Sequence, residues 1–355
     1  MSVGISLYPG LDKSDDIRRS LDLAADHDIR TYFCSLHIPE SDVRALKRDL
    51  QYILTNAAAK KIEVIADISP TALSRLHLTA EELFRSHITL RLDDGFTAEE
   101  TVRCSLTGTV CLNASTVTAA FLQKLSAGGA DFSRIKGLHN FYPRPGTGLI
   151  PAFFASQTAL CHAYGLSVGA FVAASANHRG PLYEGLPTIE NTRPLSIEKS
   201  TFVVKALGAD HIFIGDSRPC AKDMRALSAA AQTDADIIII PVTLHDTSEK
   251  TRKLLDRIYT SRPDKAEHII RAKEGRTYAK GLFIKPLTTL PARRQRGDIT
   301  VDNTDFLRYT GEIQLITAPM PAEPRTNIIA AIPEEHRYLL DCLCGDKKFT
   351  FRFIE

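Results

Sequence analysis

Short apolar segments alternate with helical patterns through about the first 230 residues of the chain, which is the length of a TIM barrel. Eight such segments occur, and apolar residues at helical spacing follow each of them. They span residues 3–7, 32–36, 62–68, 88–92, 110–113, 135–139, 167–172 and 211–215. Because a TIM barrel contains eight strand–helix units, the sequence predicts an α/β fold that begins with a (β/α)8 barrel.

A doubly wound parallel sheet is the alternative to the barrel. Such a sheet binds nucleotide phosphates at a glycine-rich turn after its first strand, and Gly4 and Gly10 alone do not make that motif. The expected helix starts fit either fold, because Ser14 is typical of an N-cap and Ser41 opens the next helix. The count of eight units favours the barrel.

The pattern changes after the apolar segment 237–241. The expected strands become short and successive, and turn residues separate them. They span residues 281–284, 299–301, 313–316, 328–332 and 349–353. Residues 248–259 are the one clearly helical stretch, so the sequence predicts a smaller, mostly β domain of closed or sandwich form. The expected domains are residues 1–240 and 241–355.

Composition and charge exclude several classes of function. The 355 residues carry a net charge of +2, which gives no strong basic field for nucleic acid or an anionic membrane. No apolar run approaches the roughly 20 residues of a membrane helix, and the first residues lack the features of a secretion signal. Seven cysteines without a CxxC pair are typical of reduced thiols. We therefore expect a cytoplasmic protein without a bound metal.

Polar residues follow most of the predicted strands, at the barrel end where TIM barrels carry their chemistry. They are Ser6, Tyr8, His37, Asp67, Asp93, Asp94, Asn113, His139, Asn140 and Asp216. Two long loops, 139–149 and 177–190, combine aromatic, arginine, amide and carboxylate side chains. Rings stack on sugars, amides and acids meet hydroxyls, and arginines bind phosphate or carboxylate, so these loops suit a charged sugar.

The chain resembles the bacterial 6-phospho-N-acetylmuramidases nearly from end to end. In the first part, the matching residues are Gly4-Ile5-Ser6-Leu7-Tyr8-Pro9-Gly10, Ala66-Asp67-Ile68-Ser69-Pro70, Arg91-Leu92-Asp93 with Gly95-Phe96, His139 to Leu149, and Glu184-Gly185-Leu186-Pro187-Thr188 with Glu190. In the second part, they are Arg296-Gly297-Asp298, Asp302-Asn303 and Tyr309-x-Gly311-Glu312-Ile313-Gln314.

The resemblance implies a TIM barrel followed by a cyclophilin-like β-barrel domain, and it implies no cofactor. It also implies cleavage of the disaccharide MurNAc 6-phosphate–GlcNAc inside the cell, during the recycling of cell-wall muropeptides. Segments 111–115, 144–146 and 215–219 depart from the family pattern. A related 6-phospho-disaccharide therefore stays an alternative substrate.

Glycoside hydrolysis usually needs two carboxyl groups that flank the scissile bond. The candidates are Asp67, Asp93, Asp94, Glu184, Glu190 and Asp216. In many glycosidase barrels the fourth and seventh strands supply the two acids, and by this analogy we predict Asp93 and Glu184 as the pair. Asp67 is the third candidate, because it could orient a sugar hydroxyl or raise the pKa of a neighbouring acid by like-charge repulsion.

For the phosphate we predict Arg179, with His178 assisting and Arg144 as a further donor, because a dianion needs more than one cation. The predicted sugar contacts are Asn113, His139, Asn140, Tyr142 and Glu190. A buried supporting role is equally open for His139. Other arginines are interpreted as solvated charges, namely Arg218, Arg271 and Arg325.

Other classes of function remain alternatives. A metal-dependent barrel hydrolase or aldolase would gather His37, Asp67, His139 and Asp216 around an ion, but no HxH or HExxH spacing supports it. A pyridoxal phosphate barrel needs a lysine at a strand end, and no predicted strand ends with one. A barrel that binds a phosphosugar without catalysis is the non-enzyme alternative. The sequence leaves the oligomeric state open.

Overall fold

The structure is a computed structural model that describes residues 1–27, 29–36, 38, 40–287 and 293–354. The chain divides into two compact units, Met1–Thr233 and Asp234–Glu355. The strands of each unit pair only within that unit. Within the described residues, no helix has both the length and the apolar character needed to cross a membrane.

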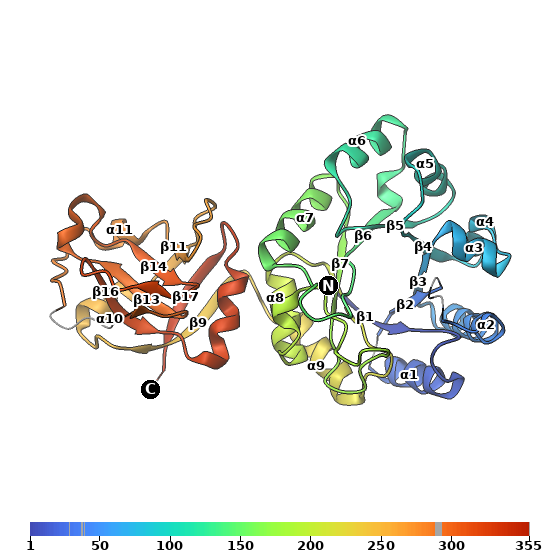
Figure 1. Ribbon diagram of the computed structural model, residues 1–355, viewed down its shortest axis with the longest axis horizontal. Helices are drawn as coiled ribbons and strands as arrows, with labels where there is room; N and C mark the ends of the chain where they lie inside the picture. Colours follow the sequence, from blue (N-terminus) through green and yellow to red (C-terminus); the bar gives the residue numbers. More distant parts are fainter. Residues whose placement is uncertain (28, 37, 39, 288–292, 355) are drawn as a thin grey trace. The chain divides into compact units, whose positions relative to one another are not determined.

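The first unit is a closed barrel of eight parallel strands, which confirms the predicted TIM barrel (Figure 1). The strands are β1 (Ser2–Leu7), β2 (Thr31–Ser35), β3 (Glu63–Ile68), β4 (Ile88–Leu92), β5 (Val110–Asn113), β6 (Ile135–Leu138), β7 (Val168–Val172) and β8 (His211–Ile214). Each pairs with its neighbour in sequence, and β8 pairs with β1 to close the ring.

Helices connect successive strands and surround the barrel (Figure 1). They are α1 (Ser14–Asp26), α2 (Val43–Lys60), α3 (Pro70–Leu76), α4 (Ala80–Arg85), α5 (Ala98–Thr107), α6 (Ala119–Ala127), α7 (Pro151–Ala163), α8 (Ile197–Ala206) and α9 (Ala221–Gln232). Two short 3₁₀ turns, η1 (Phe132–Arg134) and η2 (Glu190–Thr192), lie in the loops before β6 and after β7.

Two predicted helix starts were placed wrongly by one residue. Ser14 is the first residue of α1 rather than its N-cap, and its hydroxyl donates to Asp49 Oδ1 at 2.7 Å. The N-cap of α2 is Asp42, whose carboxylate accepts from the Ala45 amide, whereas the Ser41 hydroxyl donates to the Ile38 carbonyl. Each serine hydroxyl donates a hydrogen bond to another acceptor and does not accept one from a free helix amide. Sequence position alone does not show which of these bonds forms.

The barrel has two apolar cores. A large outer core lies between the strands and the surrounding helices. A smaller inner core fills the barrel itself with Phe33, Ile65, Cys111, Leu138, Phe171 and Phe213, and Phe141 packs on it from the loop after β6. This inner layer is a solid floor beneath the carboxyl ends of the strands, so a ligand can be held above it but cannot pass through.

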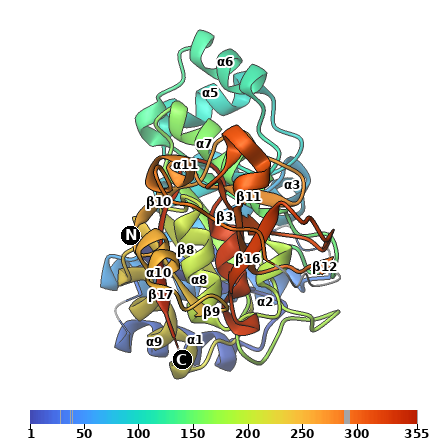
Figure 2. The ribbon, with the colours of Figure 1, turned by 90° about the vertical axis from the view of Figure 1, so that its left-hand side faces the viewer.

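The second unit is a curled, mostly β domain, as predicted (Figures 1 and 2, yellow to red). Its strands are β9 (Ile237–Leu244), β10 (Ile258–Thr260), β11 (Ile269–Arg271), β12 (Arg293–Arg294), β13 (Asp298–Asp302), β14 (Ile313–Ile316), β15 (Met320–Pro321), β16 (Thr326–Ala331) and β17 (Lys348–Phe353). The helical elements are α10 (Glu249–Leu255), α11 (Gly275–Tyr278), η3 (Thr304–Tyr309) and η4 (Glu334–Cys342).

Seven of these strands form one sheet in the order β10-β17-β9-β16-β13-β14-β11. The two edge strands approach each other, because a bridge joins Ser261, just after β10, to Ala272, just after β11. The sheet therefore curls until its edges meet, which leaves few unpaired edge groups.

Two elements predicted for the second unit were wrong. Residues 281–284 form no strand, although their burial alternates, and the side-chain amide of Asn327 bonds to the chain just after them, at Lys285 O and Leu287 N. The helix expected over 248–259 ends at Leu255, since β10 instead pairs with β17.

Candidate active site

Two carboxylates and one arginine lie together at the carboxyl ends of β3 and β4. Asp67 is buried on β3, and Arg91 and Asp93 belong to β4 and the residue after it. Alternate residues of a strand face the same side, so Arg91 and Asp93 both project into the barrel. Arg91 Nη1 lies 2.6 Å from Asp67 Oδ1 and 3.6 Å from Asp93 Oδ1.

Arg91 also reaches the loop after β6. Its Nη2 donates to Asn140 Oδ1 at 2.5 Å and to the Leu138 carbonyl at 3.4 Å. Burial alone lowers the pKa of this guanidinium, but the carboxylate of Asp67 beside it reverses the shift, and the net direction is upward. Arg91 therefore stays charged and joins three of the predicted site residues in one network.

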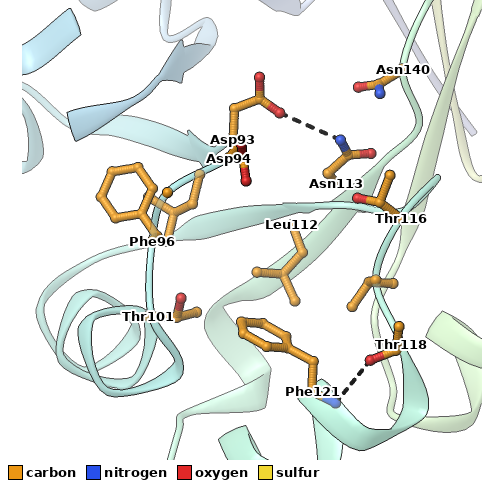
Figure 3. Close-up of a pocket in the computed structure, with 13 residues that line it drawn as sticks. Asp93, Asp94, Phe96, Thr101, Leu112, Asn113, Thr116, Thr118, Phe121 and Asn140 are labelled. Atoms are coloured by element: carbon orange, nitrogen blue, oxygen red, sulfur yellow. Dashed lines mark hydrogen bonds between the residues drawn. The ribbon is translucent and has the colours of Figure 1, made fainter. Parts of the chain in front are cut away.

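A cavity of about 520 Å³ opens beside this network (Figure 3). Asp93 and Asn113 point toward each other across it, with Asn113 Nδ2 3.4 Å from Asp93 Oδ1, and Asn140 lies beyond Asn113. Phe96 and Phe121 supply aromatic surface to the lining. Asp94 also lines the cavity, and two carboxylates, two amides and aromatic rings around one cavity suit a sugar ring with its hydroxyl groups.

His139 lies beneath this cavity rather than in its lining. It is fully buried, with Ser115 Oγ 3.2 Å from Nδ1 and Thr158 Oγ1 3.1 Å from Nε2. Burial, aided by the charge of Arg91, lowers the pKa of His139 to about 3. The Ser115 hydroxyl, which contacts the His139 ring, accepts a hydrogen bond from the backbone amide of Asn140 at 2.9 Å. A neutral His139 therefore supports the placement of Asn140.

The loops after β6 and β7 are joined over the barrel mouth. The Tyr142 amide donates to Pro187 O, the Leu149 amide to Thr188 O, and the Glu190 amide to Leu149 O, each at 2.9–3.0 Å. The buried Thr188 hydroxyl adds a bond to the Asn140 carbonyl. The two loops that the sequence analysis singled out therefore form one continuous layer.

The side chains predicted on this layer differ in their surroundings. Glu184 and Arg144 are exposed, and Tyr142 is half-buried. The carboxylate of Glu190 accepts from the amides of Gly146 and Gly148 and from Arg193. Bonds from Arg193, followed by those two amides, lower the pKa of Glu190 to about 2, although its partial burial opposes this.

Asp93 and Glu184 reach the mouth from different strands. Asp93 follows β4 and lines the cavity, whereas Glu184 follows β7 and is not among the residues that line it. Two carboxyl groups on opposite sides of a bound sugar are what glycoside hydrolysis requires, at about 5–10 Å from each other.

Arg179 lines a second cavity of about 500 Å³. Its guanidinium lies over the rings of Tyr8 and Phe141, at 4.4 and 5.2 Å from their centroids. Nε and Nη1 are buried, and neither has a hydrogen-bond partner among the described residues. Guanidinium nitrogens held in this way can receive an anion.

Asp216 fixes the loop that carries Arg179. One carboxylate oxygen accepts the Arg179 amide and the other accepts the Ala174 amide, both at 2.9 Å. Burial raises the pKa of Asp216, and these amide bonds oppose the rise. The ring nitrogens of His178 face the carbonyls of Ala174 and Tyr183, at 2.9 and 3.2 Å. Both residues thus support the loop.

Sequence reasoning missed two groups at these cavities. Arg91 was noticed only as part of a motif, although a charged residue inside an apolar strand, two positions before Asp93, is a usable signal. Asp12 lines the cavity of Arg179, and burial raises its pKa to about 6. It follows the first strand, so the rule that selected the other strand-end residues also applies to it.

The metal alternative finds no support among the residues that the structure describes, where no cluster of three or more potential ligands occurs. Asp67 is engaged with Arg91, His139 with Ser115 and Thr158, and Asp216 with backbone amides. His37, the fourth residue of that alternative, lies outside the described residues.

The fold and the site define a class of protein. It is a TIM barrel with polar cavities at the carboxyl ends of its strands, followed in the chain by a curled β domain. The family described as 6-phospho-N-acetylmuramidase matches it in two parts, the N-terminal part at residues 3–229 and the C-terminal part at residues 238–352. The chain therefore belongs to the 6-phospho-N-acetylmuramidase family.

Two solved structures are similar over almost the whole chain. An uncharacterized protein from B. cereus is 26% identical with a TM-score of 0.63, and the match covers 99% of both chains. A conserved protein of unknown function from Enterococcus faecalis is 28% identical with a TM-score of 0.58, and the match covers 99% of this chain and 96% of that one. No curated protein matches the chain.

Proposed function

We propose that this protein is a glycosidase that cleaves MurNAc 6-phosphate–GlcNAc, or a related 6-phospho-disaccharide, during the recycling of cell-wall fragments in the cytoplasm. The observation that carries the proposal is the network in which Arg91 joins Asp67, Asp93 and Asn140 beside a sugar-sized cavity, in a chain of this family. The cyclophilin-like character of the second domain belongs to the same proposal.

In the proposed reaction, Asp93 and Glu184 act on opposite sides of the scissile bond. One carboxyl group protonates the leaving oxygen, and the other attacks the anomeric carbon directly or activates a water for that attack. Asn113 and Asn140 would hold sugar hydroxyls beside Asp93. Asp67 orients Arg91 rather than touching the reacting atoms, since its carboxylate is buried against that guanidinium.

Substitution of the two carboxyl groups tests this mechanism. We expect Asp93→Asn and Glu184→Gln each to lower kcat by about 10³-fold or more while substrate binding persists, because groups needed in the transition state are lost. Turnover is measured on the phosphorylated disaccharide, and binding by calorimetry. Near-normal turnover in both variants would rule out this pair. Tight binding by the wild type without any cleavage would instead support the phosphosugar-binding alternative. Loss of turnover when a chelator is added would support the metal-dependent alternative.

Arg179 is the proposed phosphate ligand, because its buried nitrogens Nε and Nη1 have no partner among the described residues. The exposed Arg144 could add a second donor. We expect Arg179→Ala to lower kcat/KM for a 6-phospho-glycoside by about 10- to 100-fold, the worth of one or two charged hydrogen bonds. The same variant should leave hydrolysis of the non-phosphorylated glycoside almost unchanged. Arg134→Ala, at the other end of the barrel, is the control, and equal losses on both substrates would refute the role of Arg179.

A further inference from the structure

The carboxylate of Glu190 has no free acceptor position for a sugar. Its Oε1 accepts from the Gly146 amide at 2.9 Å and from Arg193 Nε at 2.8 Å. Its Oε2 accepts from the Gly148 amide and from Arg193 Nη2, both at 2.8 Å. A carboxylate offers about four acceptor positions, so a hydroxyl could bind only by displacing one of these donors.

Arg193 extends the same contact to both loops of the mouth. Besides Glu190, it donates to the carbonyls of Tyr142 and Arg144 in the loop after β6, at 2.9 and 3.4 Å. It also donates to the carbonyls of Glu184 and Gly185 in the loop after β7, at 3.2 and 3.0 Å. The planar guanidinium spreads five N–H donors over three nitrogens and so reaches acceptors on several sides, whereas a lysine offers three donors from one atom.

The loop after β6 is packed directly against this pair. A Cβ on Gly148 would lie 2.6 Å from Glu190 Oε2 and 2.8 Å from the Glu190 amide nitrogen. The side chains of the pair are largely shielded, with 25% of Glu190 and 11% of Arg193 exposed. Partial burial of a charged pair strengthens its attraction relative to a surface pair.

We propose that Glu190 and Arg193 form a clasp that positions the two mouth loops, and that Glu190 acts on the substrate only through this clasp. The inference rests on the proposed function, because the clasp holds the backbone of Glu184, Tyr142 and Arg144. Glu190 and Arg193 are therefore positioning residues. Glu190 is accordingly not a sugar ligand, although the sequence predicted it as one.

Amide hydrogen exchange of the ligand-free protein tests the clasp without any substrate. In Glu190→Gln we expect the Gly146 and Gly148 amides to exchange at least about tenfold faster than in the wild type, because an ionic acceptor is lost. Arg193→Lys should produce the same change, which keeps the test valid if one variant folds poorly. Asp131→Asn is the matched control, since Asp131 pairs with Arg134 at the same i,i+3 spacing around η1. Unchanged exchange at both glycines in both clasp variants would overturn the proposal.

Activity supplies the second arm. Glu190→Gln and Arg193→Lys should each lower kcat/KM on the phosphorylated disaccharide by about 10²-fold. The kcat/KM of the double variant should be no lower than that of the less active single variant. Losses that add fully in the double variant would show that Glu190 and Arg193 act independently on the substrate and would overturn the proposal. A wild-type protein inactive on every 6-phospho-glycoside would overturn the proposed function, while the exchange arm would still decide the clasp.

Discussion

Arg91 is the residue on which the geometry of the candidate site most depends. It is buried together with Asp67, and the side chains of the two are only 3% and 5% exposed. Removal of one partner from a buried ion pair costs about 3–5 kcal/mol, because the other charge is left without compensation. Asp93 and Asn140 would lose their common partner at the same time.

Replacement of Arg91 by lysine separates its charge from its shape. A single ammonium group cannot reach Asp67, Asp93 and Asn140 together, so we expect Arg91→Lys to lower kcat by about 10²-fold with KM changed much less. Steady-state kinetics on the 6-phospho-disaccharide would measure kcat and KM, and a thermal melt would measure the change in stability. Lys136→Met is the control, because Lys136 pairs with Glu63 at the opposite end of the barrel interior at 2.6 Å. If Arg91→Lys kept the wild-type kcat, Arg91 would be a purely structural residue.

At the scale of elements, periodicity predicted where strands lie but not which groups they pair with. A short, mostly apolar run was enough to locate β4 and β14, which have five and four residues and are buried along their whole length. A similar run at 281–284 was misleading, since it forms no strand and the chain just after it is bonded to the Asn327 side chain at Lys285. Pairing across distant sequence, as in β9 with β17, depends on tertiary contacts that no local pattern contains.

The candidate site shows the same division. Strand-end position selected Asp67, Asp93, Asn113 and Asn140, because all parallel strands of a barrel end at one face. The sequence did not show that Glu190 is saturated by Gly146, Gly148 and Arg193, because those bonds form only when two loops meet. Loop residues could therefore be chosen by type, while their partners needed the structure.

At the scale of the whole molecule, two buried groups make opposite contributions to the pH dependence of stability, one in each unit. In the barrel, the pKa of His139 is lowered by burial to about 3 from 6.5. Between these values the unfolded chain binds a proton at His139 that the folded barrel does not, so His139 makes the barrel lose stability as the pH falls, while the raised pKa of Asp12 acts in the opposite direction. In the second unit, burial raises the pKa of Asp302 from 3.8 to about 7. There the folded state holds the extra proton, so that unit loses stability as the pH rises through the window.

Calorimetric unfolding of the full chain at several pH values would test both signs. Each group contributes up to about 1.4 kcal/mol per pH unit inside its window. We expect His139→Gln to flatten the pH dependence of the barrel's unfolding temperature. We expect Asp302→Asn to flatten that of the second unit and to raise the unfolding temperature of this unit at pH values above 7. The asparagine keeps an acceptor for the Thr326 hydroxyl, which lies 3.0 Å from Asp302 Oδ1, so the variant removes the charge and little else. Variant and wild-type curves that stay parallel across each window would show that these residues do not set the response, which would then arise from other groups, such as Asp12 and Asp216 in the barrel.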